Sequence, residues 1–126
     1  MQTMAAVALG GAVGATARYL VSSAALKILG GAFPYGTLLV NVLGCLLMGV
    51  LIESVALKLQ MPKEMQSLLS TGFLGAFTTF STFSLDAVTL FERQAYAACA
   101  AYILSSFILS IAALVVGLLL VRVAVS

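Results

Sequence analysis

The sequence predicts an all-α membrane protein with four transmembrane helices in a single domain, residues 1–126. Of the 126 residues, 63% are hydrophobic and only 8% are charged. An average soluble domain carries about 25% charged residues, so this chain has too few polar side chains to cover a surface that faces water. Charged residues are also spaced so that the stretches between them reach the roughly 20 residues that a spanning helix needs. We therefore expect spans at about 3–26, 35–57, 65–91 and 95–122, with any function located inside the bilayer.

The first span carries small residues at helical spacing. Ala6, Gly10, Gly14 and Arg18 follow each other at intervals of four and share one helix face. Small residues at this spacing allow another helix to approach closely. Arg18 should then point at protein or at a water-filled vestibule, and an arginine within the membrane is a candidate for function. The alternative is that its side chain extends to the nearby membrane surface.

The second span begins after Pro34 and places an asparagine in the hydrocarbon region. Thr37, Asn41 and Gly44 fall on one helix face. The side-chain amide of Asn41 needs partners for two donors and an acceptor. It either binds a neighbouring helix and stabilises the bundle or directs a donor into an ion pathway. The sequence leaves both possibilities open.

The third span contains the stretch GFLGAFTTFSTFS, from Gly72 to Ser84, with two glycines, four phenylalanines and five hydroxyl residues. Hydroxyl side chains can bond backbone groups that are freed where a membrane helix is interrupted. Such interruptions are tolerated where they are buried in protein or line a cavity, and in transporters they often form ion sites. We therefore predict a break in this helix near residues 75–79.

The fourth span has a stripe of its own, in which Cys99, Tyr102, Ser106 and Ser110 lie close to one face. The two serines either pack against a neighbouring helix or continue a polar track from the third span. Cys45 and Cys99 both fall within spans, and we expect them to be small packing residues. Two thiols in a chain without histidine do not predict a metal site.

The polar residues favour passage of a small anion. No catalytic constellation is present, so we expect no enzyme, and a net charge of +2 does not indicate a nucleic-acid partner. The four acidic residues lie near span ends, whereas a cation pathway usually carries an acid within the membrane. An anion instead requires donors, and the edges of aromatic rings are electropositive. The candidate donors are Asn41, Thr79, Ser81, Phe80, Phe83, Ser106, Ser110 and Arg18.

Three stretches carry a family resemblance: GGAVGATARY at 10–19, PYGTLLVNVLG at 34–44, and GFLGAFTTFSTFS. The last two are highly specific. Through them the sequence resembles the small bacterial fluoride channels of the Fluc or CrcB family over its whole length. Tyr102 and the serines extend the resemblance more weakly into the fourth span. The resemblance implies a passive fluoride-selective channel that exports fluoride through the inner membrane. It further implies an antiparallel, dual-topology homodimer with two pores.

The resemblance also implies roles for particular residues. Phe80 and Phe83 match phenylalanines whose ring edges contact fluoride, and Asn41 matches a pore-lining asparagine. The backbone carbonyls of Gly75 and Thr78 match those that hold a structural sodium ion at the dimer interface. Further matches to polar-track, pore or vestibule positions are Thr79, Tyr102, Ser106, Ser110 and Arg18. Asp86 falls where the family commonly carries an acid, more often glutamate, near a pore mouth.

Two other functions fit four short spans. A small dual-topology multidrug exporter would need a carboxylate in the first span, and this span has none. A subunit that only assists membrane assembly would pass no anion. The basic residues do not fix an orientation in the membrane, because their numbers on the two sides are nearly equal. One side would carry Lys58, Lys63 and Arg122. The other would carry Lys27 and Arg93, and also Arg18 if it reaches a vestibule.

Overall fold

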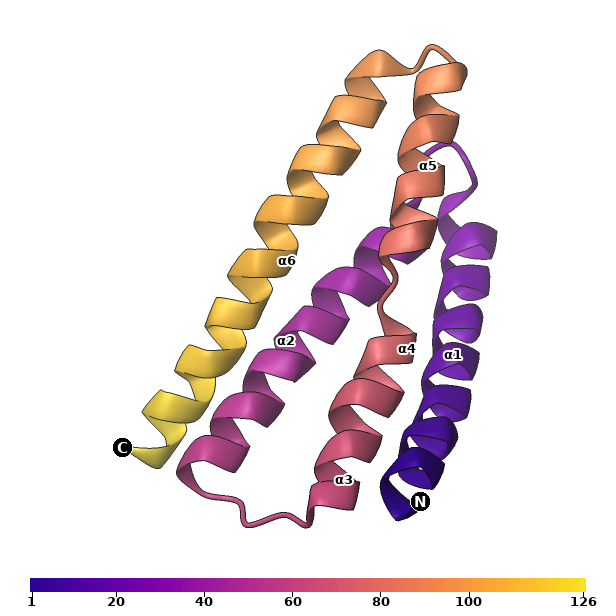
Figure 1. Ribbon diagram of the computed structural model, residues 1–126. Coiled ribbons are helices and arrows are strands. Elements are labelled where there is room, and N and C mark those ends of the chain that lie inside the picture. The colour runs from indigo at the N-terminus through magenta and orange to yellow at the C-terminus, as the bar shows by residue number, and fades with distance from the viewer.

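Four long helical segments form the bundle in the computed structural model, which describes residues 1–126, and the third and fourth segments extend beyond the other two at one end (Figure 1). Three are continuous: α1 (Gln2–Leu29), α2 (Tyr35–Leu57) and α6 (Tyr96–Val125). The remaining segment spans Lys63–Glu92 and is interrupted. All four are long and apolar enough to cross a membrane. The predicted all-α architecture with four spans is therefore confirmed.

Most of the apolar surface of the chain is exposed. Only 18 of the 126 residues are buried, although the chain is rich in leucine, isoleucine, valine and phenylalanine. Large apolar side chains such as Leu20, Ile108 and Leu120 project from the outer faces of α1 and α6. A soluble protein would not leave such continuous apolar faces uncovered. Lipid or further protein must cover them.

The third segment consists of four pieces. They are α3 (Lys63–Ser67), a π-helical piece η1 (Leu68–Leu74), the single turn α4 (Gly75–Phe77) and α5 (Phe80–Glu92). Thr78 and Thr79 between α4 and α5 are extended, with ψ angles of 158° and 121°. The predicted break is thus present at the end of the 75–79 range. Gly75 itself is helical, and the preceding glycine-containing stretch is wound as a π-helix rather than broken.

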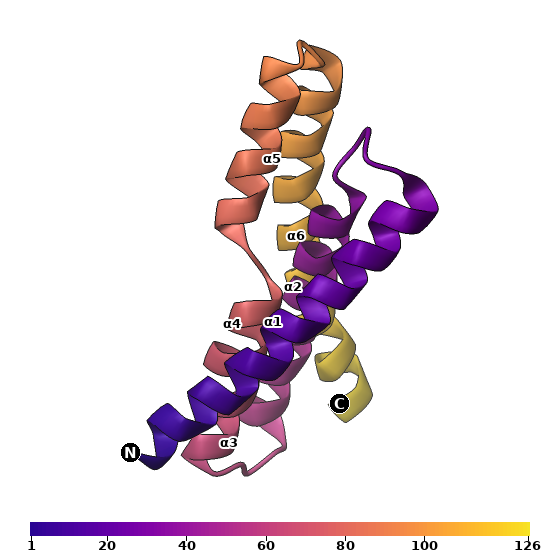
Figure 2. The ribbon, with the colours of Figure 1, turned by 90° about the vertical axis from the view of Figure 1, so that its right-hand side faces the viewer.

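The break allows the third segment to change its packing partner. Before the break, α3, η1 and α4 pack against α1, whereas α5 packs mainly against α6 (Figures 1 and 2). Helix α2 packs along α6 and also contacts both parts of the broken segment. An uninterrupted helix could not follow both neighbours, so the bend at Thr78 and Thr79 joins two helix pairs into one bundle.

Glycines set the distance between the closest helices. A β-carbon at Gly10 or Gly14 would collide with the backbone carbonyls of Leu68 and Phe73 in the third segment. Gly49 and Gly117 allow the same close approach between α2 and α6. Backbone contact of this kind is typical of small-residue interfaces in membranes. The prediction that the first span presents a small-residue face to another helix is confirmed.

The two chain termini and the connection from Lys58 to Pro62 lie toward one end of the bundle (Figure 1). At this end Arg122 of α6 forms an ion pair with Glu53 of α2. The turn from Gly30 to Pro34 and the turn between α5 and α6 lie at the opposite end. An even number of spans requires this arrangement, and it divides the basic residues between the two ends as the sequence indicated.

We predict that Gly14→Ala destabilises the protein while Gly11→Ala does not. The added methyl group at position 14 meets the backbone of Phe73, which cannot move without shifting the whole segment. Overpacking of this kind costs about 1–3 kcal/mol. At position 11 the nearest atom is the carbonyl oxygen of Gly72 at 3.9 Å, an ordinary contact. The measurement is the unfolding midpoint of each purified variant in detergent, and equal midpoints for the two variants would contradict the packing described here.

Candidate functional site

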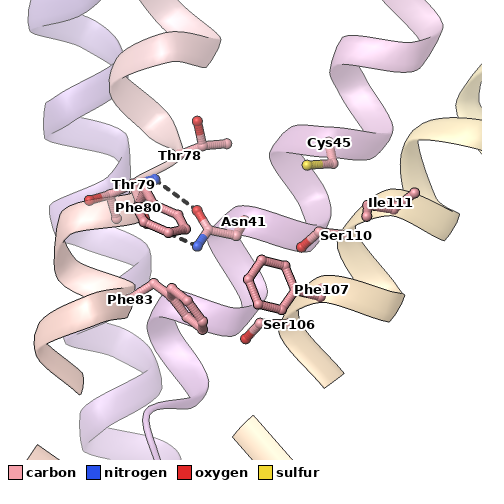
Figure 3. A pocket seen from close by; sticks show the side chains of 10 residues that line it. All are labelled: Asn41, Cys45, Thr78, Thr79, Phe80, Phe83, Ser106, Phe107, Ser110 and Ile111. Carbon is pink, nitrogen blue, oxygen red and sulfur yellow. Dashed lines mark hydrogen bonds between the residues drawn. The ribbon is translucent and has the colours of Figure 1, made fainter. Parts of the chain in front are cut away.

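A cavity of about 220 Å³ lies beside the break, between α2, the broken segment and α6 (Figure 3). It brings together residues that are far apart in the sequence. Its wall consists of Asn41, Cys45, Thr78, Thr79, Phe80, Phe83, Ser106, Phe107, Ser110 and Ile111. Six of the eight donors predicted from the sequence, all except Ser81 and Arg18, are in this wall. No carboxylate, lysine or arginine lines it.

Asn41 is bonded to the backbone at the break through both ends of its side-chain amide. Its Nδ2 donates to the carbonyl oxygen of Thr79 at 3.0 Å, and the Thr79 N–H donates to its Oδ1 at 2.8 Å. These two bonds, drawn in Figure 3, satisfy the backbone groups of an extended residue within the membrane span. The sequence left open whether Asn41 stabilises the bundle or lines a pathway. The structure shows the interhelical bond, and because Nδ2 carries two N–H groups, the second remains for the cavity.

Hydroxyl groups around the break mainly serve the backbone. Thr78 Oγ1 donates to the Leu74 carbonyl at 3.0 Å. Thr79 Oγ1 accepts the N–H of Thr82 at 3.1 Å and so caps the first turn of α5. Ser84 Oγ donates to the Phe80 carbonyl at 3.0 Å. Ser81 Oγ lies 3.2 Å from Thr79 Oγ1 and outside the cavity wall. Thr79 Oγ1 thus satisfies a freed N–H, as the sequence predicted. Thr78 instead bonds a carbonyl that already accepts its own backbone N–H, and Ser84 bonds a carbonyl within α5.

Aromatic rings form one side of the cavity. Phe83 is buried, and its ring centroid lies 5.5 Å from that of Phe80 and 5.6 Å from that of Phe107. The Phe83 and Phe107 rings meet edge to face at 71°. A pair in this geometry directs an electropositive ring edge at a neighbouring electron-rich group. Phe107 was not predicted as a site residue. The sequence offers only one indication of its place in the cavity, namely that it directly follows the candidate donor Ser106.

Ser106 supplies an unpaired donor. Its side chain is buried, its hydroxyl oxygen has no hydrogen-bond partner, and the residue lines the cavity. Ser110 follows one helical turn later on the same wall. Leaving a buried hydroxyl unpaired costs about 1–3 kcal/mol. Such a group needs a partner from within the cavity, and the uncharged donors around it suit a small anion.

Three other predicted residues lie outside this wall. Arg18 Nε donates to the carbonyl of Ala76 at 3.0 Å, so its side chain contacts the protein just before the break. The Tyr102 hydroxyl donates to Asp86 Oδ2 at 3.1 Å. Tyr102 is fully buried, with its ring 5.2 Å from that of Phe83, and it therefore supports the aromatic side of the cavity from behind. Gly75, the third, lies on the exposed side of α4.

Two backbone carbonyls at the break lack their helical partners. Thr79 N–H, which would bond the Gly75 carbonyl in a continuous helix, is bonded to Asn41 instead. The Thr78 carbonyl accepts no hydrogen bond. Between them in the sequence, the Ala76 carbonyl is occupied by Arg18. The carbonyl oxygens of Gly75 and Thr78, which the family resemblance assigns to a sodium ion, are thus without the helical bonds they would otherwise accept.

The comparisons with known proteins agree with one another. The family described as CrcB-like protein, Camphor Resistance (CrcB), matches residues 5–118. A protein of Rhizobium johnstonii is 53% identical over 116 residues, which cover 92% of this chain and 93% of that protein. A protein of Agrobacterium fabrum is 52% identical over 122 residues, covering 97% of this chain and 98% of that protein. Both relatives are named fluoride-specific ion channel FluC.

We predict that Asn41→Leu lowers stability more than Asn41→Asp. Leucine removes both bonds to Thr79, at about 1–3 kcal/mol for each backbone group left unpaired. Aspartate in its neutral form keeps an acceptor for the Thr79 N–H and offers an O–H donor in place of the amide N–H. The unfolding midpoints in detergent should follow the order parent, aspartate variant, leucine variant. A leucine variant as stable as the parent would show that these bonds do not hold the break.

Proposed function

This chain belongs to the CrcB family, and we propose that it is a fluoride-selective ion channel through which fluoride leaves the cell down its electrochemical gradient. It is a multi-pass membrane protein and not an enzyme. Export in this direction relieves fluoride toxicity. Passive conduction is supported by the cavity, which is lined by no carboxylate or basic side chain that would exchange protons during transport.

The observation that carries this proposal is the unpaired hydroxyl of Ser106 in a cavity of uncharged donors. Fluoride is small, hard and strongly hydrated, so it must exchange water for close donors when it enters a narrow pore. Hydroxyl groups, the free N–H of Asn41 and the edges of Phe80 and Phe83 are such donors. Because none carries a full positive charge, the ion is bound well enough to enter and weakly enough to leave.

The competing functions are less well supported. Family membership separates the chain from the small multidrug exporters. A subunit that only assists assembly would have no use for a cavity with an unpaired buried hydroxyl. We place the channel in the inner membrane of a bacterial cell, because its spans are helices, whereas single-chain proteins of the bacterial outer membrane are β-barrels.

We propose that two copies pair in antiparallel orientation and form two pores. The support is the open side of the cavity, where the side chains of Phe80 and Phe107 are 70% and 49% exposed. The backbone at the break also needs cover, because Gly75 is exposed and its carbonyl lacks the Thr79 N–H. Irregular backbone within a membrane is not left facing lipid. A second copy placed against the break satisfies both needs.

A structural sodium ion at this interface follows from the same carbonyls. We propose the carbonyls of Gly75 and Thr78, which match the sodium-binding positions of the family, as its hard oxygen ligands, with Arg18 on the Ala76 carbonyl between them. Two antiparallel copies would present two such pairs to a shared axis. These residues would hold the ion, whose role is to satisfy the freed backbone.

We predict that liposomes containing the purified protein release fluoride and retain chloride. Efflux of each ion is followed with an ion-selective electrode after the potassium gradient is short-circuited. Ser106→Ala should not lower the unfolding midpoint, because the hydroxyl has no protein partner to lose. Its fluoride efflux should fall about tenfold, the effect of losing one hydrogen bond to a charged group.

Two results would contradict this account. Chloride efflux as fast as fluoride efflux would exclude a fluoride-selective channel. Parental efflux from Ser106→Ala would remove Ser106 from the pathway even if the channel itself were confirmed. A suitable comparison variant is Ser126→Ala, because Ser126 is exposed at the end of the chain, far from the cavity residues in the sequence.

Dual topology predicts labelling from both sides of the membrane. A single cysteine is placed in the 58–62 connection of a variant without Cys45 and Cys99, and intact cells are treated with an impermeant thiol reagent. About half of the protein should react before lysis and the rest afterwards, because the basic residues favour neither orientation. Labelling that is complete or absent before lysis would show a single orientation.

A further inference from the structure

The two cysteines of the chain lie in different environments. Cys45 follows Asn41 by one helical turn on α2 and lines the cavity (Figure 3). Cys99 is buried among Phe83, Leu90 and Tyr102, and its Sγ donates to the Ala87 carbonyl at 3.3 Å. Their positions in the sequence do not distinguish them, and both are predicted to be packing residues. Cys45 differs from Cys99 in that it also lines the cavity.

The thiol of Cys45 is not an isolated feature. It lies opposite Ser110 on α6. One turn before Ser110, Ser106 lines the same cavity, and its buried hydroxyl has no partner in the protein, which independently indicates a ligand there. Asn41, whose Nδ2 carries a second N–H, lines the same cavity. A ligand that moves along this wall past Asn41, Ser106 and Ser110 therefore passes the sulfur of Cys45.

We propose that Cys45 is a lining residue of the fluoride pathway and a site at which a small sulfur electrophile closes the channel. The proposal rests on the function proposed above. It assigns to Cys45 a modification chemistry that Cys99, packed against α5, does not share. The class of reagent is a small uncharged thiosulfonate or disulfide, since a bulky or charged compound would not enter a largely apolar cavity of about 220 Å³.

The chemical step is a thiol–disulfide type exchange. Cys45 loses its proton to water, and the thiolate attacks the sulfenyl sulfur of methyl methanethiosulfonate. A bond forms between Sγ and that sulfur, the bond to the sulfonyl sulfur breaks, and methanesulfinate leaves with the electron pair. A dithiol reductant reverses the modification by taking up the methylthio group in a second exchange.

The modification should block fluoride for two reasons. It replaces the thiol hydrogen, a weak donor, with an apolar methyl group, and it fills space between α2 and Ser110. Fluoride that has exchanged its water for protein donors would lose them at this point and face an apolar obstruction. Conduction requires that the ion find donors along the whole pathway, so that it can both enter and leave. One added methylthio group on this pathway is therefore sufficient to block fluoride.

The test uses full-length protein in liposomes, treated with methyl methanethiosulfonate before fluoride efflux is started. We expect efflux from the parent and from Cys99→Ala to fall about tenfold or more, because both retain the lining thiol. Efflux from Cys45→Ala and from Cys45→Ser should stay at each variant's own untreated rate. A dithiol reductant should restore the parent and Cys99→Ala.

Mass spectrometry of the treated protein separates this proposal from the proposed function. The expected result is one methylthio group on Cys45 and none on Cys99, whether or not the sample conducts fluoride. Modification of Cys45 without loss of efflux would overturn the proposal while leaving the channel intact. Absence of modification at Cys45 would overturn it as well, since the thiol would then be inaccessible. No fluoride efflux from the untreated parent would instead contradict the proposed function.

Discussion

The pair of hydrogen bonds between Asn41 and Thr79 is the interaction on which the rest of the structure depends. Within a bilayer every backbone N–H and C=O needs a partner from the protein, because there is no water to replace it. An extended residue in the middle of a spanning helix breaks this rule unless another group takes over. The amide of Asn41 offers one donor and one acceptor to Thr79, in the pattern that another backbone strand would offer. The break can therefore persist in the membrane.

Several features follow from a stable break. The third segment can leave α1 and join α6, which gives the bundle its shape. The change of direction opens the cavity between α2 and α6, with Ser106 unpaired on its wall. Of the five hydroxyls from Thr78 to Ser84, that of Thr79 caps α5, and those of Thr78 and Ser84 bond the carbonyls four residues before them. The donors left for an anion come mainly from other helices, through Asn41, Ser106 and Ser110.

The sequence predicted the features that depend on local spacing. Charge-free intervals predicted the four spans. Small residues at intervals of four predicted the face of α1 that packs closely against another helix, and the hydroxyl-rich stretch predicted the break. It did not predict Phe107 or Cys45 in the cavity, because the direction of a side chain in an apolar helix depends on how neighbouring helices are rotated. Nor did it predict that Arg18 would bind Ala76, or that the Tyr102 hydroxyl would bind Asp86 and not face the cavity. Those partners become neighbours only after the bundle forms.

We propose that the side-chain amide of Asn41 stabilises the break through its bonds to Thr79 and also donates to fluoride. Asn41 is the only asparagine of the chain, so asparagine labelled with ¹⁵N in its side chain reports on this single amide. The measurement is the NMR spectrum of its two N–H protons in the reconstituted protein during a fluoride titration, with chloride as control. We expect one proton to be protected from exchange by its bond to Thr79, and the other to shift with fluoride and not with chloride. Two protons that exchange equally fast and respond to neither ion would contradict the account.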